Sequence, residues 1–349
     1  MEKLNKEKLI ITCLILPYFL FIFYSLSPAY ASSDIRVGAY YYVWYIGKKN
    51  ENITDSPIIG WENYWSNDSN LIKKHLTWFE QLDLDFIIIS WWWNPGVGPK
   101  QFEDNATKAV FETVKNESSN LEIAIMVESE NQTATFNYTR IYNYIYDNYV
   151  SKYPENYMKL YGKPLLCFYN GETLTKNGNI PLDDRFEVRI VGHQYYVHWI
   201  YNSFPGWHRE EQELCMDGEI NVMPRFDKRT FGEPRTVDIS LTEGFYDQQW
   251  QTVLNYAKKG QVKIVTITSW NEYAERTQIE PAFDNATVSP NSPQTTNPFY
   301  LYNKTRDYIK QLRNTIPETI PPEILIIIII IIIIIAAASA LAKLIASRT

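Results

Sequence analysis

Short apolar runs recur along the chain, separated by stretches in which apolar residues repeat at helical spacing. Eight runs are predicted to be strands: Arg36–Tyr42, Asp85–Trp91, Leu121–Val127, Pro164–Tyr169, Glu187–Gly192, Tyr196–Tyr201, Glu219–Met223 and Val262–Thr268. Several are continuously apolar, which is typical of parallel strands buried on both faces. Helices are predicted between them: Asn70–Leu82, Ala106–Lys115, Tyr138–Tyr149 and Asp247–Lys259. This alternation favours a single-domain α/β fold, a (β/α)8 TIM barrel. An open doubly wound sheet is the alternative, but no Gly-rich phosphate loop follows any run.

The two ends of the chain have the composition of targeting segments rather than of the fold. Residues 1–31 combine lysines with a long apolar stretch and the small-x-small site Ala29-Tyr30-Ala31, which predicts a signal peptide or an uncleaved N-terminal anchor. Residues 324–342 carry no charge and, as a helix, would span roughly 28 Å, which predicts a transmembrane helix. A Pro-rich stalk, 316–323, precedes it and a basic cytoplasmic tail, 343–349, follows it. The body, residues 32–315, is therefore expected at the cell surface, outside the membrane.

The composition of the body excludes several classes of function. The chain has a formal net charge of −7 and no cluster of lysine and arginine, which argues against nucleic-acid binding. The histidines are scattered and no zinc spacing exists, so no metal or other cofactor is expected. Cys167 and Cys215 could form a disulfide, but their spacing does not place them together. Sequons for N-glycosylation, which fit an external protein, stand at Asn52, Asn67, Asn105, Asn116, Asn131, Asn137, Asn285 and Asn303.

Aromatic and polar residues collect at the ends of the predicted strands, where a barrel places its functional side chains. Aromatic faces stack on the C–H groups of sugars, and polar side chains bind the hydroxyl groups. The predicted substrate-binding residues are Trp44, Tyr45, Trp91, Trp92, Glu128, Tyr169, Asp227, Arg229 and Asn271. Core packing is the alternative for each aromatic ring. Because side chains alternate along a strand, three consecutive tryptophans cannot all point into one core, and at least one faces the barrel mouth or a loop.

Two glutamates after the last predicted strand, Glu272 and Glu275, are the candidate catalytic pair. Glycoside cleavage needs an acid to protonate the leaving oxygen and a second carboxylate on the sugar side. If the turn is helical, their Cβ atoms lie about 5–6 Å apart, and like charges that close raise one pKa, as an acid requires. The alternative is a structural ion pair with Arg276 or Arg229. Glu280 is predicted to hold the loop.

Residues 271–281 read Asn-Glu-Tyr-Ala-Glu-Arg-Thr-Gln-Ile-Glu-Pro, which resembles the Asn-Glu-Trp-x-Glu-Gly-Thr-Gln-Ile-Glu-Pro signature of glycoside hydrolase family 99, the endo-α-mannosidases. Residues 41–45 and 90–92 resemble the first two strand motifs of that family, and Glu128 and Tyr169 stand at its third- and fourth-strand positions. The resemblance implies a metal-free, retaining, endo-acting α-mannosidase. In it, Glu272 would draw a proton from the 2-hydroxyl of the substrate, whose oxygen attacks C1 to give a 1,2-anhydro sugar. Glu275 would protonate the leaving group and later activate water.

Departures from the signature leave two other functions open. Arg276 replaces the family's glycine and places a cation beside Glu275, where it would lower that pKa. Ser129 replaces a proline, and Tyr273 a tryptophan. The WbsX-type proteins, a group linked to glycosyltransferases, share the Asn-Glu-Trp-x-Glu core but usually lack Thr-Gln-Ile, so a hydrolase is preferred. The other alternative is a non-catalytic glycan-binding surface protein, although such a protein has no need of both glutamates.

Overall fold

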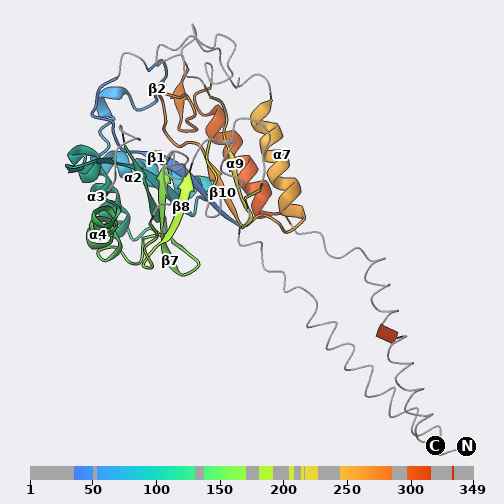
Figure 1. Cartoon of the computed structure of the whole chain (residues 1–349). Coiled ribbons are helices and arrows are strands. Elements are labelled where there is room, and N and C mark those ends of the chain that lie inside the picture. Colours follow the sequence, from blue (N-terminus) through green and yellow to red (C-terminus); the bar gives the residue numbers. More distant parts are fainter. Residues whose placement is uncertain are drawn as a thin grey trace, which may run out of the picture.

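The core of the protein is a curled sheet of parallel strands (Figure 1). The computed structural model describes residues 35–49, 53–129, 137–169, 181–191, 204–207, 214–215, 217–226, 244–284, 297–315 and 332–333. Its parallel strands are β1 Arg36–Tyr42, β3 Phe86–Asn94, β5 Glu122–Glu128, β7 Lys163–Tyr169, β8 Glu187–Val191, β9 Glu219–Val222 and β10 Ile264–Ile267. Each matches a predicted strand to within a few residues. The predicted strand at 196–201 lies outside the described residues.

The order of these strands in the sheet is β8-β7-β5-β3-β1-β10-β9, with every neighbouring pair parallel. Except for β8 and β9, which stand at the two ends of this order, strands that follow one another along the chain are neighbours, and β1 lies between β3 and the last strand, β10. The register is shared across this junction, since Gly38 pairs with Phe86 on one side and Thr266 on the other. This is the order of a (β/α)8 barrel, of which the described strands form a curled, half-barrel sheet. The carboxyl ends of all these strands therefore meet at one edge.

Alternate side chains of the sheet enter two separate hydrophobic cores, which explains why the strands are apolar on both faces. The inner core, on the concave side of the sheet, includes Tyr40, Phe86, Ile88, Met126, Leu165 and Val191. The outer core lies between the sheet and the helices and includes Val37, Ile87, Ile89, Ile125, Phe111, Ile145 and Trp250. Residues 204–207 cross the inner side, where the Pro205 carbonyl accepts hydrogen bonds from Tyr40 and Thr266, each at 2.7 Å.

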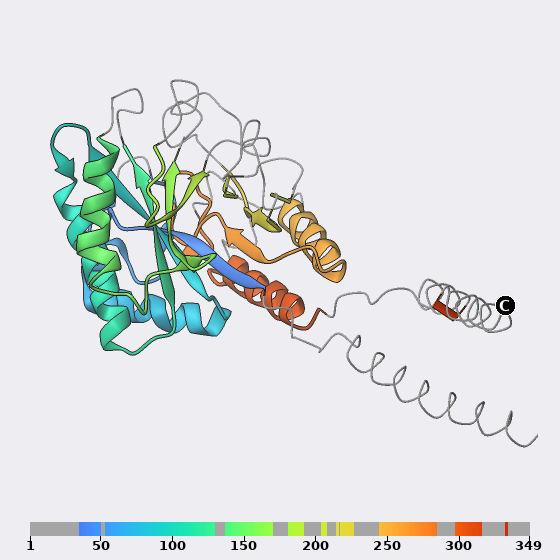
Figure 2. The same cartoon turned by 60° about the horizontal axis from the view of Figure 1, so that its bottom comes forward.

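Helices cover the outer face of the sheet (Figure 2). They are α2 Ser69–Leu82, α3 Gln101–Asn116, α4 Tyr138–Ile145 with the π-helical turn η2 Tyr146–Val150, α7 Phe245–Lys258 and α9 Tyr300–Arg313. The first four match predicted helices, whereas α9 had not been predicted. The helix α9 contacts both α2 and α7, and α2 contacts α3. Helices from the two halves of the chain thus form one continuous outer layer.

A second, two-stranded sheet joins the loops that follow β1 and β10. Its strands are β2 Ser56–Pro57 and β11 Ala282–Phe283, which pair antiparallel. The remaining short elements are η1 Trp61–Asn63, β4 Gly98–Pro99 on the edge of β3 and β6 Lys159–Leu160 on the edge of β7. The β2–β11 pair matters most for function, because β11 directly continues the turn that carries Glu272 and Glu275.

Most of the predicted targeting segments cannot be compared with the structure. Residues 1–31, 316–323 and 343–349, and all but two residues of the stretch 324–342, lie outside the described residues. In the part of the chain that is described, no helix combines the length and the apolar character needed to cross a bilayer.

Candidate active site

The turn after β10 folds back on itself instead of forming a helix. The Ile279 amide donates to the Ser269 carbonyl at 3.0 Å, and the Ser269 and Thr277 hydroxyls are hydrogen bonded at 2.8 Å. Inside this closed turn, the Glu272 amide donates to the Ser269 hydroxyl at 2.8 Å. The helical spacing considered for the two glutamates is therefore wrong, but the turn still brings them together: the Glu272 carboxylate accepts the Glu275 amide at 3.3 Å.

Glu272 is the more buried of the pair, with an exposed fraction of 2%. Burial raises its pKa well above the usual range, and the charges of Glu275 and Glu128 raise it further. The Ala274 amide, which donates to Glu272 Oε1 at 2.8 Å, acts in the opposite direction by stabilising the carboxylate. Glu272 therefore holds a proton more strongly than an ordinary glutamate and, when ionised, is a stronger base.

Glu275 is half-buried and has a partner that the sequence did not reveal. The indole N–H of Trp207 donates to Glu275 Oε2 at 2.7 Å, and the Trp207 ring lies 5.1 Å from that of Tyr169. Trp207 is itself buried, and its backbone amide donates to the hydroxyl of Thr268, the residue after β10, at 3.3 Å. The carboxylate of Glu275 is thus held in place by a rigid aromatic donor.

A third carboxylate, Glu128, stands at the end of β5, as predicted. It is 8% exposed and accepts a hydrogen bond of 2.5 Å from the Ser90 hydroxyl, to which Trp92 donates in turn at 3.0 Å. Burial raises the pKa of Glu128 to about 7; the Ser90 bond lowers it and the charge of Glu275 raises it. The charges of Glu128 and Glu275 therefore influence one another within one site.

Aromatic rings lie beside the carboxylates. Trp44 and Trp92 are both half-buried, and their ring centroids are 5.8 Å apart. Tyr42 lies next to Trp44, with a centroid separation of 4.6 Å. Burial raises the pKa of the Tyr42 phenol, and the charges of Glu128, Glu272 and Glu275 add to the effect. Tyr42 was not among the predicted site residues, whereas Trp44, Trp92, Glu128 and Tyr169 were.

Trp91, predicted to bind substrate, lies on the opposite side of β3 from Trp92. It is fully buried in the outer core, its indole donates to Asp104 of α3 at 3.0 Å, and its ring stacks on Tyr144 at 5.7 Å. The alternation of side chains along a strand is the reason, because Trp91 and Trp92 cannot face the same way. The expected contact between Trp91 and the substrate does not fit this position.

Asn271 and Tyr45, also predicted to bind substrate, lie beneath the site and hold it together. The Asn271 side chain accepts the Tyr42 amide at 2.7 Å and donates to the Tyr42 carbonyl at 2.9 Å. The Tyr45 hydroxyl donates to the Asn271 carbonyl at 2.6 Å. Both residues are buried, so their polar groups connect the end of β1 to the turn after β10. Asp227 and Arg229, the remaining predicted residues, lie outside the described residues.

Glu280 holds the loop, as predicted. It is completely buried and accepts hydrogen bonds from the Tyr64 hydroxyl at 2.5 Å and the Tyr273 hydroxyl at 2.9 Å, while its second oxygen lies 3.0 Å from His75 Nε2. These partners belong to the loop after β1, to α2 and to the turn itself. The anchored turn cannot shift without breaking several buried hydrogen bonds.

Arg276, which was considered as an alternative ion-pair partner for a catalytic glutamate, contacts two aspartates; Arg229, the other candidate partner, lies outside the described residues. The guanidinium Nε of Arg276 lies 3.1 Å from an Asp55 oxygen and its Nη2 3.4 Å from Asp284. Both carboxylates belong to the segments that flank the β2–β11 sheet. The cation that was expected to lower the pKa of Glu275 is thus engaged by two buried aspartates.

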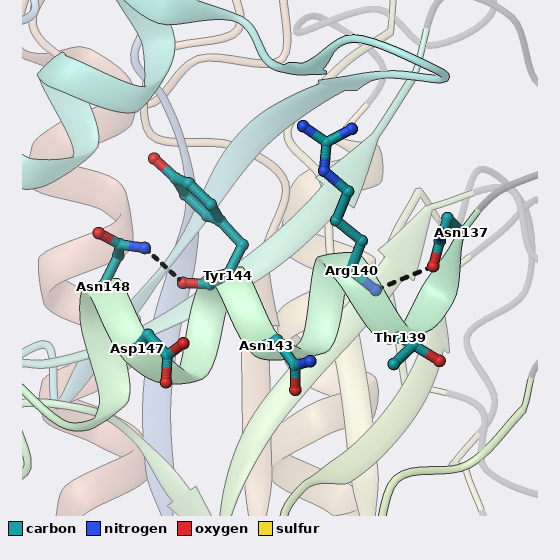
Figure 3. A pocket seen from close by; sticks show the side chains of 7 residues that line it. All are labelled: Asn137, Thr139, Arg140, Asn143, Tyr144, Asp147 and Asn148. Atoms are coloured by element: carbon teal, nitrogen blue, oxygen red, sulfur yellow. Dashed lines mark hydrogen bonds between the residues drawn. The ribbon is translucent and has the colours of Figure 1, made fainter.

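A separate recess lies on the outside of the molecule, along α4 (Figure 3). It has a volume of about 480 Å³ and is lined by Asn137, Thr139, Arg140, Asn143, Tyr144, Asp147 and Asn148. The side chain of Asn137 accepts the Arg140 amide at 3.0 Å and so caps the helix. The recess shares no residue with the carboxylate site.

Comparison with known proteins agrees with this fold. No protein-family model matches the chain. The mouse glycoprotein endo-α-1,2-mannosidase-like protein is 23% identical over 272 residues, which are 64% of this chain and 57% of that protein. The chain therefore spans little more than half of that relative's length. The family 99 endo-α-mannosidase of Bacteroides thetaiotaomicron superimposes with a TM-score of 0.57 at 14% identity, covering 80% of this chain and 98% of the bacterial one. Its complex with bis-tris propane gives a TM-score of 0.56 at 16% identity.

The resemblance to glycoside hydrolase family 99 is thereby confirmed. The chain has the fold of the bacterial endo-α-mannosidase, and its sequence is similar to that of the mouse protein. A structure described as a glycoside hydrolase-like protein also superimposes, with a TM-score of 0.51 at 14% identity.

Proposed function

We propose that this protein is a retaining glycoside hydrolase that cleaves α-mannosidic linkages within glycans. The observation that carries the proposal is the catalytic turn: Glu272 and Glu275 are joined in one closed loop at the carboxyl edge of the sheet, beside half-buried tryptophans. Two carboxylates in different environments are what acid and base roles in glycoside cleavage require. The α-mannose specificity is taken from the described activity of the bacterial and mouse relatives.

The proposed roles follow from the environment of each glutamate. Glu272, buried and with a raised pKa, takes the proton of the 2-hydroxyl as that oxygen attacks C1. Glu275, oriented by Trp207, gives a proton to the departing oxygen as the glycosidic bond breaks, which leaves a 1,2-anhydro sugar. Water then adds to C1, Glu275 recovers its proton from that water, and Glu272 returns its proton to O2. Two inversions at C1 give net retention of the α configuration.

The binding residues in this proposal are those that border the carboxylates. Trp44 and Trp92 offer ring faces for the sugar, and Glu128 and Tyr169 offer polar groups for its hydroxyls. Asn271 and Tyr45 are assigned a positioning role, because their polar groups bind the protein itself. Asp227 and Arg229, which follow β9, remain proposed ligands. A complete eight-stranded barrel, with residues 196–201 between β8 and β9, would enclose the site.

The proposed location is the cell surface, with the catalytic domain outside and residues 324–342 in the membrane. The sequence of the two ends supports this location, as does the exposure of sequon asparagines. Asn67, Asn105, Asn116 and Asn137 are all exposed, on the helices or the loops that border them. A glycan at any of these positions would extend from the outer layer of the molecule.

The experiment that tests the proposed reaction compares two substrates. An α-mannobioside with a free 2-hydroxyl on the sugar that is cleaved is incubated beside its 2-O-methyl analogue, and the first-formed product is observed by NMR. We expect the α anomer first from the free sugar and no cleavage of the methylated one, because it has no proton for Glu272 to remove. Release of the β anomer, or cleavage of both substrates at similar rates, would contradict the proposed chemistry.

A further inference from the structure

Arg276 has an unusual backbone conformation for its residue type. Its φ is +55°, in the left-handed region that side chains with a Cβ rarely adopt and that glycine adopts freely. The family signature has glycine at this position, which fits the same conformation. Arg276 directly follows Glu275, so the conformation of Arg276 determines the direction in which the chain leaves the proposed acid/base. Contacts with the rest of the protein must therefore stabilise this conformation of Arg276.

The side chain of Arg276 is held in a buried cluster of four charges. Arg225, at the end of β9, donates from Nη2 to Asp55 and from Nη1 to Asp284, each at 2.8 Å. Arg276 Nε donates to the same Asp55 at 3.1 Å, and Gln278 of the turn donates to it at 2.7 Å. The side chains of all four charged residues are at most 2% exposed. Among the described residues, the cluster brings together two cations and two anions.

The electrostatics of the cluster favour its ionised form. Burial alone would raise the pKa of Asp55, but the two arginines and the hydrogen bonds from Arg276 and Gln278 lower it to about 2. The cluster also holds the backbone, because Arg225 Nε donates to the Arg276 carbonyl at 2.6 Å. Both the side chain and the peptide group of Arg276 are therefore fixed by Arg225 and the two aspartates.

The cluster links the elements that build the site. Asp55 immediately precedes β2, which is labelled near the top of Figure 1, and Asp284 immediately follows β11. Arg225 follows β9, and Arg276 belongs to the turn after β10. The residue next to Glu275 is thus tied to the segments that carry Asp55, Arg225 and Asp284.

We propose that Asp55, Arg225, Arg276 and Asp284 form a positioning cluster that sets the orientation of Glu275. The inference rests on the proposed role of Glu275 as acid/base. In this chain an arginine locked by ion pairs replaces the conformational freedom of glycine. None of the four residues touches the substrate in this account; they act through the backbone on either side of Arg276.

The test compares substitutions that separate charge from backbone strain. Arg276→Ala removes the cation but keeps a Cβ at positive φ, whereas Arg276→Gly removes the cation and relieves the backbone. Asp284→Asn keeps both arginines and nearly the same shape. Arg276→Gly/Asp284→Asn removes one positive and one negative charge together and also relaxes the backbone. Arg306→Ala, an exposed arginine of α9, is the control.

We expect kcat to fall by about tenfold or more in Arg276→Ala, with KM changed less than about twofold, because the acid/base is displaced while the binding rings are not. Arg276→Gly and Asp284→Asn should lose less, and the double variant should recover most of the wild-type kcat. Equal kcat in Arg276→Ala and wild type would overturn the proposal, as would a double variant that is worse than both single ones.

Amide hydrogen exchange of the turn provides a readout that needs no substrate. We expect faster exchange at residues 272–277 in Arg276→Ala and Asp284→Asn, but not in Arg306→Ala. Unchanged exchange in both variants would overturn the proposal that the cluster fixes the turn, even if activity fell. If the wild type cleaves no glycoside while the exchange behaves as expected, the proposed hydrolase function fails but the role of the cluster in fixing the turn is upheld.

Discussion

Three carboxylates within reach of one another's charges are the main feature of this protein at the scale of single residues. Glu128, Glu272 and Glu275 come from two strand ends, and the pKa values of Glu128 and Glu272 are raised mainly by burial and then by neighbouring charge. Full ionisation of all three is unfavourable near neutral pH. A site in which protons are retained on some carboxylates can supply both an acid and a base.

Replacing Glu128 by glutamine should shift the pH dependence of activity. The charge of Glu128 is one cause of the raised pKa of Glu272, so its removal lowers that pKa. Because kcat/KM reports the ionisation of the free enzyme, its rising limb should move toward lower pH. The measurement is a profile of kcat/KM against pH for Glu128→Gln and wild type. If the rising limb stayed at the same pH in Glu128→Gln, or moved to higher pH, Glu128 would not raise the pKa of Glu272.

Glu219 is a buried carboxyl that belongs to the opposite end of the sheet. It is 1% exposed, neither oxygen has a hydrogen-bond partner among the described residues, and its contact with Arg189 is 3.7 Å long. Burial raises its pKa to about 7. The folded protein therefore keeps this proton between pH 4.5 and 7 while the unfolded chain releases it, so stability falls with rising pH across that window.

The resulting prediction concerns the free energy of unfolding of Glu219→Gln. Between pH 4.5 and 7, the free energy of unfolding of the wild type should fall by up to about 3 kcal/mol because of this group. Outside that window, the group should cause no change with pH. The glutamine variant should lack this decline and become the relatively more stable protein above pH 7. Arg189 keeps Glu187 and Asp217 as partners, each at 3.0 Å. Urea unfolding of wild type and Glu219→Gln at several pH values measures this difference, with Glu62→Gln, at an exposed position, as the control. If the free energies of unfolding of wild type and Glu219→Gln changed with pH in the same way, the raised pKa of Glu219 would be refuted.

At the scale of elements, apolar patterning predicted the strands well because each is buried on both faces. Such strands carry a signal that depends little on their neighbours, as the agreement of β1 with Arg36–Tyr42 illustrates. The helix α9 was missed because its buried residues are few and its surface is strongly polar. The turn after β10 was considered as a helix because Glu272 and Glu275 are three apart, but Ser269 and Thr277 close it into a loop.

Several contacts that complete the site join segments that are distant along the chain. Trp207, Ser90 and Arg225 contact Glu275, Glu128 and the Arg276 carbonyl only because the sheet curls and its strand ends converge. Their partners lie 38 to 68 residues away along the chain. Patterning predicts which strands exist and which end is functional, but hydrogen bonds between loops depend on the tertiary structure.

The anchoring of the catalytic turn can be tested through Glu280. Glu280→Ala leaves the Tyr64 and Tyr273 hydroxyls and His75 buried without their acceptor, so the free energy of unfolding should fall by about 3 kcal/mol. Glu80→Ala, an exposed residue of the same helix as His75, should change it by less than about 0.5 kcal/mol. Chemical denaturation measures both. Equal stability of the two variants would mean that Glu280 does not anchor the turn.

At the scale of the whole molecule, the fold brings the candidate site residues from distant parts of the chain to one edge of the sheet. The end of β1 supplies Tyr42 and Trp44, β3 and β5 supply Trp92 and Glu128, and the turn after β10 supplies the glutamate pair. Parallel strands make this possible because all their carboxyl ends point the same way. The alternation of predicted strands and helices was enough to predict that these residues share one edge of the sheet. The closure of the barrel and the attachment to a membrane remain predictions.

The most direct test of the central claim is hydrolysis of α-linked mannose oligosaccharides by the body, residues 32–315, in wild type, Glu272→Gln and Glu275→Gln. We expect turnover by the wild type and a loss of at least about a thousandfold in kcat for each variant, because each glutamate moves a proton in the rate-determining chemistry. Binding of the oligosaccharides without turnover in all three proteins would contradict this expectation and indicate a glycan-binding protein instead.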